Sequence, residues 1–253
     1  ASNCWYYRIM TENGQSKNYK INIHLVLEYL AFFIAFRYYI FLKKRTKDAI
    51  PNTNRLSIIL GAALGAFLGS RIIGFLENPL YSTDISSFIT ILNTKTIMGG
   101  LFGGLLGVKL SKKIIGEKQS SGDLFVFPII VGIFIGRIGC FLSGINEFTY
   151  GKVTTLFVGM DLGDGLNRHP IALYELLFLV CLFVFLWKTK SKNIENGLLF
   201  KYFMISYFSF RFCIEFLKPN TFFILGLSSI QILCLICYLY YYKTILNLSK
   251  NAR

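Results

Sequence analysis

Charged side chains are scarce in this sequence. Only 16% of the 253 residues are Asp, Glu, Lys or Arg, while 54% are apolar and 17% are aromatic. Soluble domains carry about 25% charged residues, so this chain has too little polar surface for a soluble globule. The low charge content excludes the soluble classes and indicates a membrane protein.

Further absences narrow the choice. The six cysteines form no framework, because five of them lie in or beside apolar segments, where a thiol behaves as a small apolar group. The sequence shows no internal repeat, and no pair of helices broken by Gly or Pro recurs between its halves, as it does in many transporters. We therefore expect neither a disulfide scaffold nor a transporter, and we expect no metal site.

Apolar segments of membrane-spanning length occur along most of the chain. A span takes about 20 residues, and the candidates are residues 25–42, 57–76, 97–115, 124–141, 171–187, 198–217 and 222–242. Lysine and arginine cluster in the residues that follow the first, third, fifth and seventh of these segments. By the positive-inside rule, these four stretches are cytoplasmic. We expect an all-α polytopic bundle of seven transmembrane helices, a single membrane domain over residues 1–253, with the N-terminus outside and the C-terminus cytoplasmic.

The net charge of +14 could also indicate a nucleic-acid partner. Its alternation between successive loops follows membrane topology instead. We therefore expect the lipid bilayer as a partner and no nucleic acid.

Glycines recur every four residues in three of the predicted spans. They are Gly61, Gly65 and Gly69 in the second, Gly99, Gly103 and Gly107 in the third, and Gly132 and Gly136 in the fourth. Small residues at this spacing let helix backbones approach closely in lipid. We expect these three helices to form the tight centre of the bundle, with packing as the first explanation for each glycine and ligand contact as the second.

Three arginines lie inside the even-numbered spans. If those spans run outward, Arg71, Arg137 and Arg211 each lie about 13 or 14 residues from an inner end, which is about 20 Å along a helix. Guanidinium groups suit phosphate oxygens, so we predict an anion site in the outer half of the membrane, with a phospholipid headgroup as its ligand. The alternative is a structural network, in which the arginines pair with carboxylates or backbone carbonyls.

Other polar side chains gather at the predicted outer ends of the spans. Tyr207, Arg211 and Glu215 share one face of a helix because they recur every four residues. The others are His24, Glu28, Lys95, Arg168, His169, Tyr174, Glu175 and Lys218. The external loop of residues 145–169 adds Glu147 and Gly151, and a loop of this length outside a compact bundle is more often functional than idle.

Five motifs follow one another along these spans: "GSRIIGF", "TIMGGLFGG", "GRIGCFLSG", "RHPIALYE" and "YFSFRFCIEFLKP". In this order and spacing they resemble the prolipoprotein diacylglyceryl transferases, seven-span enzymes of the bacterial cytoplasmic (inner) membrane. The resemblance implies transfer of the diacylglyceryl group of phosphatidylglycerol to the lipobox cysteine thiol in the signal-peptide region of a preprolipoprotein. It implies a thioether product, release of glycerol phosphate, and no cofactor.

The resemblance also implies roles for particular residues. Arg137 and Arg211 match the family's signature arginines, Glu215 its glutamate on the same helix as Arg211, and Tyr207 its aromatic partner. Our candidates for accepting the thiol proton are Glu215, Glu147 and His169, in that order. We assign to substrate binding Arg71, Lys95, Gly99, Gly100, Gly151, Arg168, Glu175 and Lys218.

The sequence departs from the family pattern at three of these motifs. Cys140 stands where the family commonly has Asn, Met98 where it has His, and Lys218 where it has Arg. Methionine cannot accept a proton, so any proton transfer made by the family histidine must be made here by another group. The alternative interpretation is a non-catalytic protein of the same fold, which binds an anionic phospholipid or recruits a partner.

Overall fold

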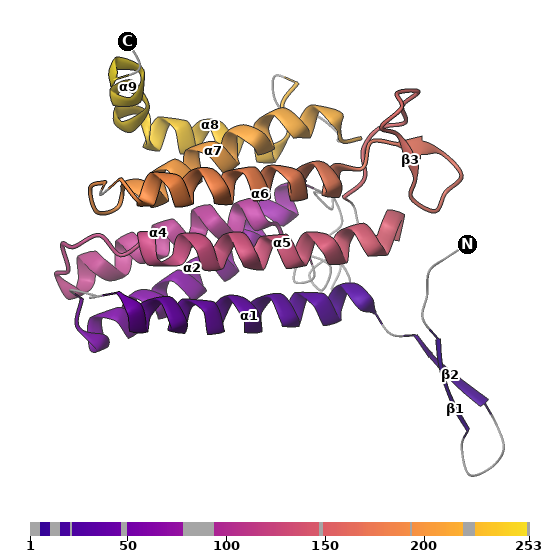
Figure 1. Cartoon of the computed structure of the whole chain (residues 1–253), viewed down its shortest axis with the longest axis horizontal. Helices are drawn as coiled ribbons and strands as arrows, with labels where there is room; N and C mark the ends of the chain where they lie inside the picture. Colours follow the sequence, from indigo (N-terminus) through magenta and orange to yellow (C-terminus); the bar gives the residue numbers. More distant parts are fainter. Residues whose placement is uncertain are drawn as a thin grey trace. The chain divides into compact units, whose positions relative to one another are not determined.

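Helices make up most of the structure, a computed structural model that describes residues 6–10, 16–20, 22–46, 50–77, 94–146, 149–192, 194–219 and 226–251 (Figure 1). The helices are α1 (Ile23–Arg45), α2 (Asn52–Glu77), α4 (Ile97–Ile115), α5 (Val126–Ser143), α6 (Ile171–Lys190), α7 (Leu198–Ile214), α8 (Ser229–Tyr240) and α9 (Tyr242–Asn251). Short 3₁₀ helices are found at Asp123–Phe125, Gly144–Asn146 and Glu215–Leu217. Two antiparallel hairpins complete the secondary structure: β1 (Tyr6–Met10) pairs with β2 (Ser16–Lys20), and β3 (Met160–Asp161) with β4 (Asn167–Arg168).

Each predicted span coincides with helix over most of its length. Within the described residues, four helical segments are long and apolar enough to cross a membrane: Ile23–Arg45, Asn52–Glu77, Asp123–Ser143 and Ile171–Lys190. A helical membrane protein is therefore supported. The other three predicted spans correspond to α4, α7 and α8, so the count of seven spans and the orientation of the termini stay predictions.

The last predicted span begins later than expected. Residues 222–225 lie outside the described part of the chain, and Gly226 has a left-handed φ of 71°. Helix α8 starts only at Ser229, where the Ser228 hydroxyl accepts from the backbone N–H of Gln231 while the Gln231 side chain accepts from the backbone N–H of Ser228. This reciprocal capping box satisfies two backbone donors, and it places the helix start several residues after position 222.

Helix α4 has the bounds that its sequence predicts. The Thr96 side chain accepts a hydrogen bond from the Gly99 backbone N–H and caps the N-terminus. At the other end, Gly116 adopts a left-handed φ of 71° and its backbone N–H donates to the carbonyl of Lys112. A polar cap before the apolar run and a glycine after it are the expected signals for the start and end of a helix.

The chain packs as two compact units. The first comprises Ala1–Phe41, Phe127–Val184 and Leu217–Pro219, and the second comprises Leu42–Val126, Phe185–Phe216 and Asn220–Arg253. The single membrane domain expected over residues 1–253 stays a prediction.

In the second unit, α2 and α4 pack along their glycines. A Cβ atom added at Gly65 would overlap the carbonyl oxygen of Gly103, and one added at Gly69 would overlap that of Gly99. Backbones therefore touch directly, as small residues allow in lipid. Packing between the second and third predicted spans is confirmed.

In the first unit, two glycines of α5 pack against α1, a helix that was not among the three predicted to form the tight centre. A Cβ atom added at Gly132 would lie 3.3 Å from the Cβ of Ala35 on α1, and one added at Gly139 would lie 3.3 Å from the Cβ of Leu27. Around Gly136 there is open space within 4 Å. Small residues on α5 thus serve to bring α1 close.

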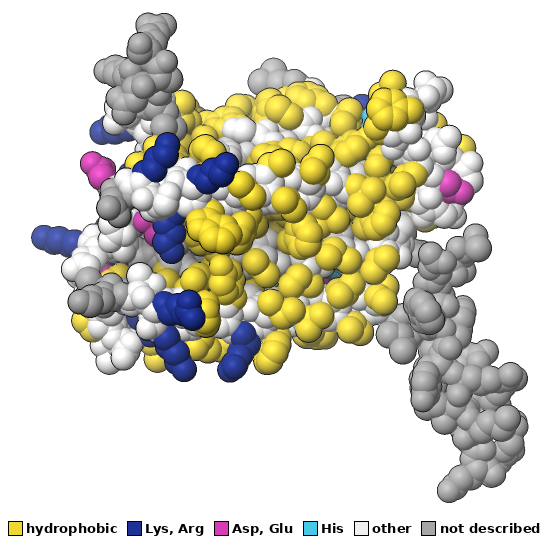
Figure 2. Space-filling model, in the orientation of Figure 1, with side chains coloured by type: hydrophobic (Ala, Val, Ile, Leu, Met, Phe, Trp, Pro, Cys, Tyr) yellow, Lys and Arg dark blue, Asp and Glu magenta, His cyan; other side chains and the backbone are white. Residues whose placement is uncertain are grey.

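The helix surfaces are strongly apolar, and apolar side chains cover much of the face drawn in Figure 2. Phe32 and Phe33 of α1, Ile114 of α4, and Leu177 and Trp187 of α6 are all exposed. Large exposed apolar areas are unfavourable in water and mark contact with lipid or protein. This surface agrees with the apolar helix lengths in indicating a membrane protein.

Candidate functional site

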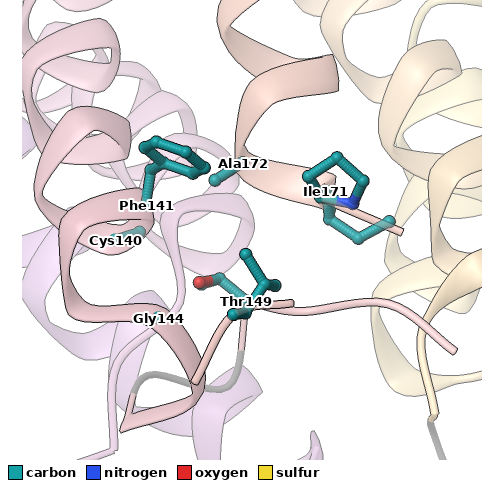
Figure 3. Close-up of a pocket in the computed structure, with 8 residues that line it drawn as sticks. Cys140, Phe141, Gly144, Thr149, Ile171 and Ala172 are labelled. Carbon is teal, nitrogen blue, oxygen red and sulfur yellow. The ribbon is translucent and has the colours of Figure 1, made fainter. Parts of the chain in front are cut away.

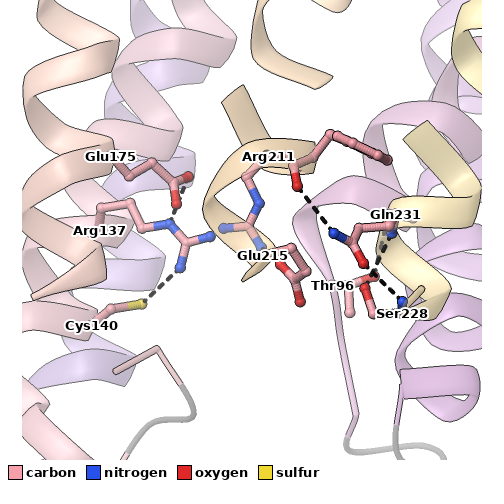
Figure 4. Close-up of polar contacts among 10 residues, drawn as sticks. Thr96, Arg137, Cys140, Glu175, Arg211, Glu215, Ser228 and Gln231 are labelled. Atoms are coloured by element: carbon pink, nitrogen blue, oxygen red, sulfur yellow. Dashed lines mark hydrogen bonds and ion pairs between the residues drawn. The ribbon is translucent and has the colours of Figure 1, made fainter. Parts of the chain in front are cut away.

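The first unit holds a buried ion pair between α5 and α6. The Nε of Arg137 lies 2.8 Å from Oε1 of Glu175 (Figure 4). Glu175 has no exposed surface, and Arg137 is 7% exposed. A charge in an apolar helix is costly unless it is paired, and the contact joins two residues that were predicted for the site. The pair fixes the orientation of the Arg137 guanidinium.

Cys140 and His24 extend this pair toward α1. The Nη1 of Arg137 donates to Sγ of Cys140 at 3.7 Å, and the same sulfur lies 3.5 Å from Nε2 of His24. Close approach of the two helices is possible because Gly139 has no side chain facing α1. His24 was noted at an outer helix end but was not predicted for the site; its sequence signal was an ionisable residue at the start of an apolar run.

The loop that leads into α6 is organised around His169. Its Nδ1 lies 3.0 Å from the Tyr174 hydroxyl, and its backbone carbonyl accepts from the Gly151 N–H at 2.9 Å. A Cβ atom at Gly151 would lie 2.5 Å from the Cβ of His169, so a larger residue at position 151 would displace the histidine. The structure thus gives Gly151 a role in positioning a proton-acceptor candidate.

Arg168 makes contacts within the same loop. Its Nε lies 2.7 Å from Oδ2 of Asp164, and its guanidinium lies 5.0 Å from the centre of the Tyr150 ring. Beside it, Oδ1 of Asp161 accepts backbone hydrogen bonds from Gly163, Asp164 and Gly165. These bonds stabilise the carboxylate and lower the pKa of Asp161 below its ordinary value. Arg168 and Asp161 therefore order the loop.

Two more residues were predicted for the site. Lys218 is buried, with 4% of its surface exposed. Glu147 lies outside the described residues. The role of each stays a prediction.

The second unit contains another buried ion pair, within one helical segment. Nη2 of Arg211 lies 3.2 Å from Oε2 of Glu215, and both residues are buried (Figure 4). One helical turn earlier, Tyr207 is wholly buried and its ring stacks on Phe203 with centroids 5.9 Å apart. The four-residue spacing predicted a shared face, and the contact between Arg211 and Glu215 confirms it for that pair.

Arg71 bonds a backbone carbonyl, which is the structural alternative that the sequence analysis gave for the three arginines. Its Nη1 donates to the backbone carbonyl of Thr94 at 2.9 Å, and its guanidinium lies 5.3 Å from the centre of the Phe67 ring. Lys95, beside Thr94, is exposed. Arg71 therefore anchors Thr94, two residues before the N-cap of α4. That the three arginines share one depth stays a prediction.

The start of α4 carries the remaining candidates. Gly99 packs against the backbone of Gly69, whereas a Cβ atom at Gly100 would have its nearest neighbour at 3.7 Å. Met98 is buried, with 1% of its surface exposed. Among the described residues, no group of three or more His, Cys, Asp or Glu is arranged to hold a metal ion.

Comparison with known proteins gives concordant results. The family model described as prolipoprotein diacylglyceryl transferase matches residues 15–246. The chain is 36% identical over 171 residues to the phosphatidylglycerol–prolipoprotein diacylglyceryl transferase of Nitratidesulfovibrio vulgaris, which covers 64% of this chain and 61% of that relative. Proteins of the same name from Methylobacillus flagellatus and Ehrlichia canis are 33% identical over 199 residues and 34% identical over 197 residues.

The coverage of these relatives differs. The match spans less than two thirds of the length of the N. vulgaris protein. It covers 74% of this chain and 70% of the M. flagellatus protein, and 71% of this chain and 72% of the E. canis protein. Similarity thus extends over most of the helical part of the chain.

Proposed function

The chain belongs to the prolipoprotein diacylglyceryl transferase family, and we propose that it transfers the diacylglyceryl group of phosphatidylglycerol to a cysteine thiol in the signal-peptide region of a preprolipoprotein. The thiol sulfur attacks the glyceryl carbon that carries the phosphate, a C–S bond forms, and the C–O bond breaks. The electron pair of that bond leaves with glycerol phosphate. We place the reaction in the bacterial cytoplasmic membrane, where both substrates are held in lipid.

The ion pair between Arg137 and Glu175 is the observation that carries this proposal. It holds a guanidinium group in a fixed orientation inside an apolar helix, at 2.8 Å from its carboxylate. Guanidinium nitrogens have five N–H donors, and they bind phosphate oxygens with two parallel hydrogen bonds. Arg137 therefore suits the phosphate of a lipid headgroup.

The same arrangement favours the chemical step. Negative charge builds up on the phosphate oxygens as the C–O bond breaks, and a preorganised cation stabilises that charge without having to reorient. In a site that excludes bulk water, this stabilisation is stronger than it would be in solution. Glu175 acts as a positioning residue, because it touches Arg137 and holds it in place.

Arg211 is proposed as the second phosphate-binding guanidinium. Glu215 orients it at 3.2 Å, and Tyr207 packs on the same helical segment. The remaining substrate-binding residues stay proposals; they are Arg71, Lys95, Gly99, Gly100, Gly151, Arg168 and Lys218. For Arg71 and Gly99, packing contacts already account for the residue type.

The acceptor thiol must lose its proton, because a thiol of ordinary pKa, about 8.5, is mostly protonated at neutral pH. Glu215, Glu147 and His169 remain the candidates. Glu215 is buried, and its carboxylate lies 3.2 Å from the Arg211 guanidinium. His169 is half-buried, and its Nδ1 lies 3.0 Å from the Tyr174 hydroxyl, which holds the imidazole ring in one orientation.

The loop between α5 and α6 offers a surface for the acceptor peptide. Phe157 is 98% exposed, and Val153, Leu156 and Leu166 are exposed as well. Exposed apolar side chains that are clustered mark contact sites for apolar partners. We propose that this loop contacts the apolar part of the preprolipoprotein signal peptide.

Reconstitution with both substrates tests the proposed function. The purified chain is placed in nanodiscs that contain phosphatidylglycerol and is given a peptide with a lipobox cysteine. Mass spectrometry then follows the peptide, and an enzymatic assay follows the released glycerol phosphate. A matched peptide with serine in place of the cysteine is the control, because its hydroxyl is a far weaker nucleophile than a thiolate.

A diacylglyceryl mass gain on the cysteine peptide alone, matched by release of glycerol phosphate, is the expected result. If the folded chain binds phosphatidylglycerol vesicles but yields no thioether, the transferase proposal fails. The non-catalytic lipid-binding alternative would then account for the same contacts.

A further inference from the structure

A groove in the second unit is much larger than the pocket beside the Arg137 site. That pocket, which Figure 3 shows where α5 ends and α6 begins, measures about 10 Å³ and has room for about one water molecule. The groove lies between α8 and α9 and measures about 560 Å³, within the range of about 300–1,000 Å³ that is typical of ligand sites. It is lined by Leu235, Tyr238, Leu239, Tyr242, Ile245 and Leu246.

One wall of the groove is the exposed side of α8. Leu239 is 72% exposed and Leu235 is 39% exposed, although the opposite face of this apolar helix is buried. The chain turns at Tyr241, where φ is −100° and ψ is 13°, and α9 leaves in a different direction from α8 (Figure 1). This bend places the start of α9 beside the exposed side of α8 and forms the groove.

The other wall is the apolar face of α9, which is an amphipathic helix. Tyr242, Ile245 and Leu246 share this face because they are three and four residues apart. Lys243 and Asn247 are exposed and lie four residues apart on another face. A helix with one apolar and one basic or polar face is typical of segments that lie in the plane of a membrane surface. Helix α9 therefore has the pattern of an interfacial helix.

Tyrosines and lysines gather at the junction of the two helices. The rings of Tyr240 and Tyr241 pack edge to face with centroids 4.8 Å apart. Nζ of Lys109, on α4, lies 5.7 Å from the centre of the Tyr240 ring, and Nζ of Lys243 lies 5.9 Å from that of Tyr242. Tyrosine is enriched at the headgroup level of membranes, and basic side chains there attract anionic lipids. The sequences of α8 and α9 contain no Asp or Glu, so no carboxylate of these helices offsets the positive charge.

We propose that the groove between α8 and α9 binds an anionic phospholipid. An acyl chain of the lipid fills the apolar groove, and its negatively charged headgroup lies near Lys109 and Lys243. The bound lipid holds α9 on the membrane surface. None of these residues belongs to the proposed transferase site, so this lipid is a bound structural partner and not the diacylglyceryl donor.

Photolabelling with a matched pair of lipids tests this proposal. Phosphatidylserine and phosphatidylcholine that carry the same photoreactive acyl chain are added separately to the full chain in zwitterionic nanodiscs. Mass spectrometry then quantifies labelling of the peptide that contains residues 235–246. The α1 peptide that contains Phe32 and Phe33, which are exposed apolar residues outside the groove, provides the reference for general contact with lipid.

The anionic probe is expected to label residues 235–246 at least about fivefold more than the zwitterionic probe, which is the preference that about one lysine near the membrane surface contributes. Labelling of the α1 reference should be similar for the two probes. Equal labelling of the groove by both probes overturns the proposal, because the groove would then be ordinary lipid-facing surface. Labelling by neither probe also overturns it, and would indicate that a protein segment covers the groove.

Charge variants test the assignment of the headgroup. In the double variant Lys109→Gln, Lys243→Gln, labelling by the two probes should become equal, while the zwitterionic probe labels the groove as before. Both lysines are exposed, so the melting temperature should not change. Lys192→Gln is the matched control, because it removes an exposed positive charge of the same unit that does not line the groove, and it should keep the preference. A preference that survives the double variant contradicts the role of these lysines.

Salt provides an independent measurement, since exposed charges are screened at high ionic strength. The preference for the anionic probe should fall as the salt concentration rises to about 1 M, and a preference that does not change contradicts an electrostatic origin. Phosphatidylserine is not the donor in the proposed transfer reaction, and the readout involves no transfer. Failure of the transferase proposal would therefore leave this result unaffected, and the reverse also holds.

Discussion

The Arg137 guanidinium on α5 and the Glu175 carboxylate on α6 lie 2.8 Å apart, and the carboxylate is wholly buried. Both charges are shielded from bulk water, so the contact between them contributes to the electrostatic stabilisation of each. The pair joins two apolar helices near the end of α5 and the start of α6, close to the loop that connects them. It therefore contributes to both the packing of the helices and the orientation of a guanidinium group.

Removing one partner of this pair is expected to be more damaging than removing both. Glu175→Ala removes the carboxylate that lies 2.8 Å from a buried guanidinium and should destabilise the fold by about 3–5 kcal/mol. The double variant Arg137→Met, Glu175→Leu replaces the pair by apolar side chains, and it should be clearly more stable than Glu175→Ala. Thermal unfolding of the detergent-solubilised variants measures both effects.

Lipid binding separates the structural role of the pair from its functional role. The double variant should fold yet lose affinity for phosphatidylglycerol, because no guanidinium remains at position 137. A double variant that unfolds as readily as Glu175→Ala would argue against electrostatic compensation as the reason for the pair.

The contact between α2 and α4 leads to a prediction for two adjacent glycines. A Cβ atom at Gly103 would overlap the Gly65 carbonyl oxygen, whereas one at Gly104 would have its nearest neighbours at 3.5 Å. Gly103→Ala should therefore force the helices apart and destabilise the protein by about 1–3 kcal/mol. Gly104→Ala should leave the melting temperature nearly unchanged, since the extra methyl group makes only ordinary contacts.

Each alanine variant serves as the control for the other, because both lose the same backbone freedom in the same helix. Equal melting temperatures for Gly103→Ala and Gly104→Ala would show that α2 and α4 do not pack as closely as described. Glycines at positions 61, 65 and 69 should behave like Gly103.

Local signals in the sequence account for the parts of the fold that were predicted well. The bounds of α4 follow from an apolar run that begins after a threonine and ends before a glycine. The pair of Arg211 and Glu215 follows from four-residue spacing on one helix. In each of these cases the partners are close in sequence, so a helical period is enough to place them.

Contacts between residues on different helices could not be predicted from the sequence. Glu175 was expected at the outer end of its span, yet its pairing with Arg137 depends on how α5 and α6 pack, which no spacing encodes. His24 reaches Cys140 only because Gly139 admits α1. The late start of α8 was missed because the residues before Ser228 are as apolar as those after it. Helix α9 is only ten residues long and polar on average, so a search for apolar segments of membrane-spanning length passed over it.

The turn around Asp161 is expected to be sensitive to acid. Three backbone N–H groups stabilise its carboxylate, and they hold the pKa of Asp161 below its ordinary value. The folded pKa is therefore lower than the unfolded pKa. Stabilisation of the turn is complete above the ordinary carboxyl range, about pH 4, and it is lost as the pH falls through the lowered pKa.

Hydrogen exchange of the loop amides measures this effect. At about pH 7, the Gly163 and Gly165 amides should exchange several-fold faster in Asp161→Asn than in the unmodified chain, because an uncharged acceptor makes weaker hydrogen bonds. The ratio of the two rates cancels the intrinsic pH dependence of exchange, and it should approach one in strong acid. A ratio that does not change with pH would exclude the carboxylate as the cause.

The exposed loop residue Phe157 provides a prediction for the acceptor peptide. If the loop contacts the apolar part of the signal peptide, Phe157→Ser should raise KM for that peptide several-fold, since burying an aromatic side chain contributes about 1.5–3 kcal/mol when complete. Affinity for phosphatidylglycerol and kcat should remain unchanged, because the ion pairs of Arg137 and Arg211 do not involve this residue. Steady-state kinetics with a series of peptide concentrations separates the two parameters. Phe157→Leu is the matched control, because it keeps an apolar side chain and should retain most of the peptide affinity. An unchanged KM in Phe157→Ser would exclude this loop tip from peptide binding, whereas a fall in kcat would indicate that the loop positions the catalytic groups instead.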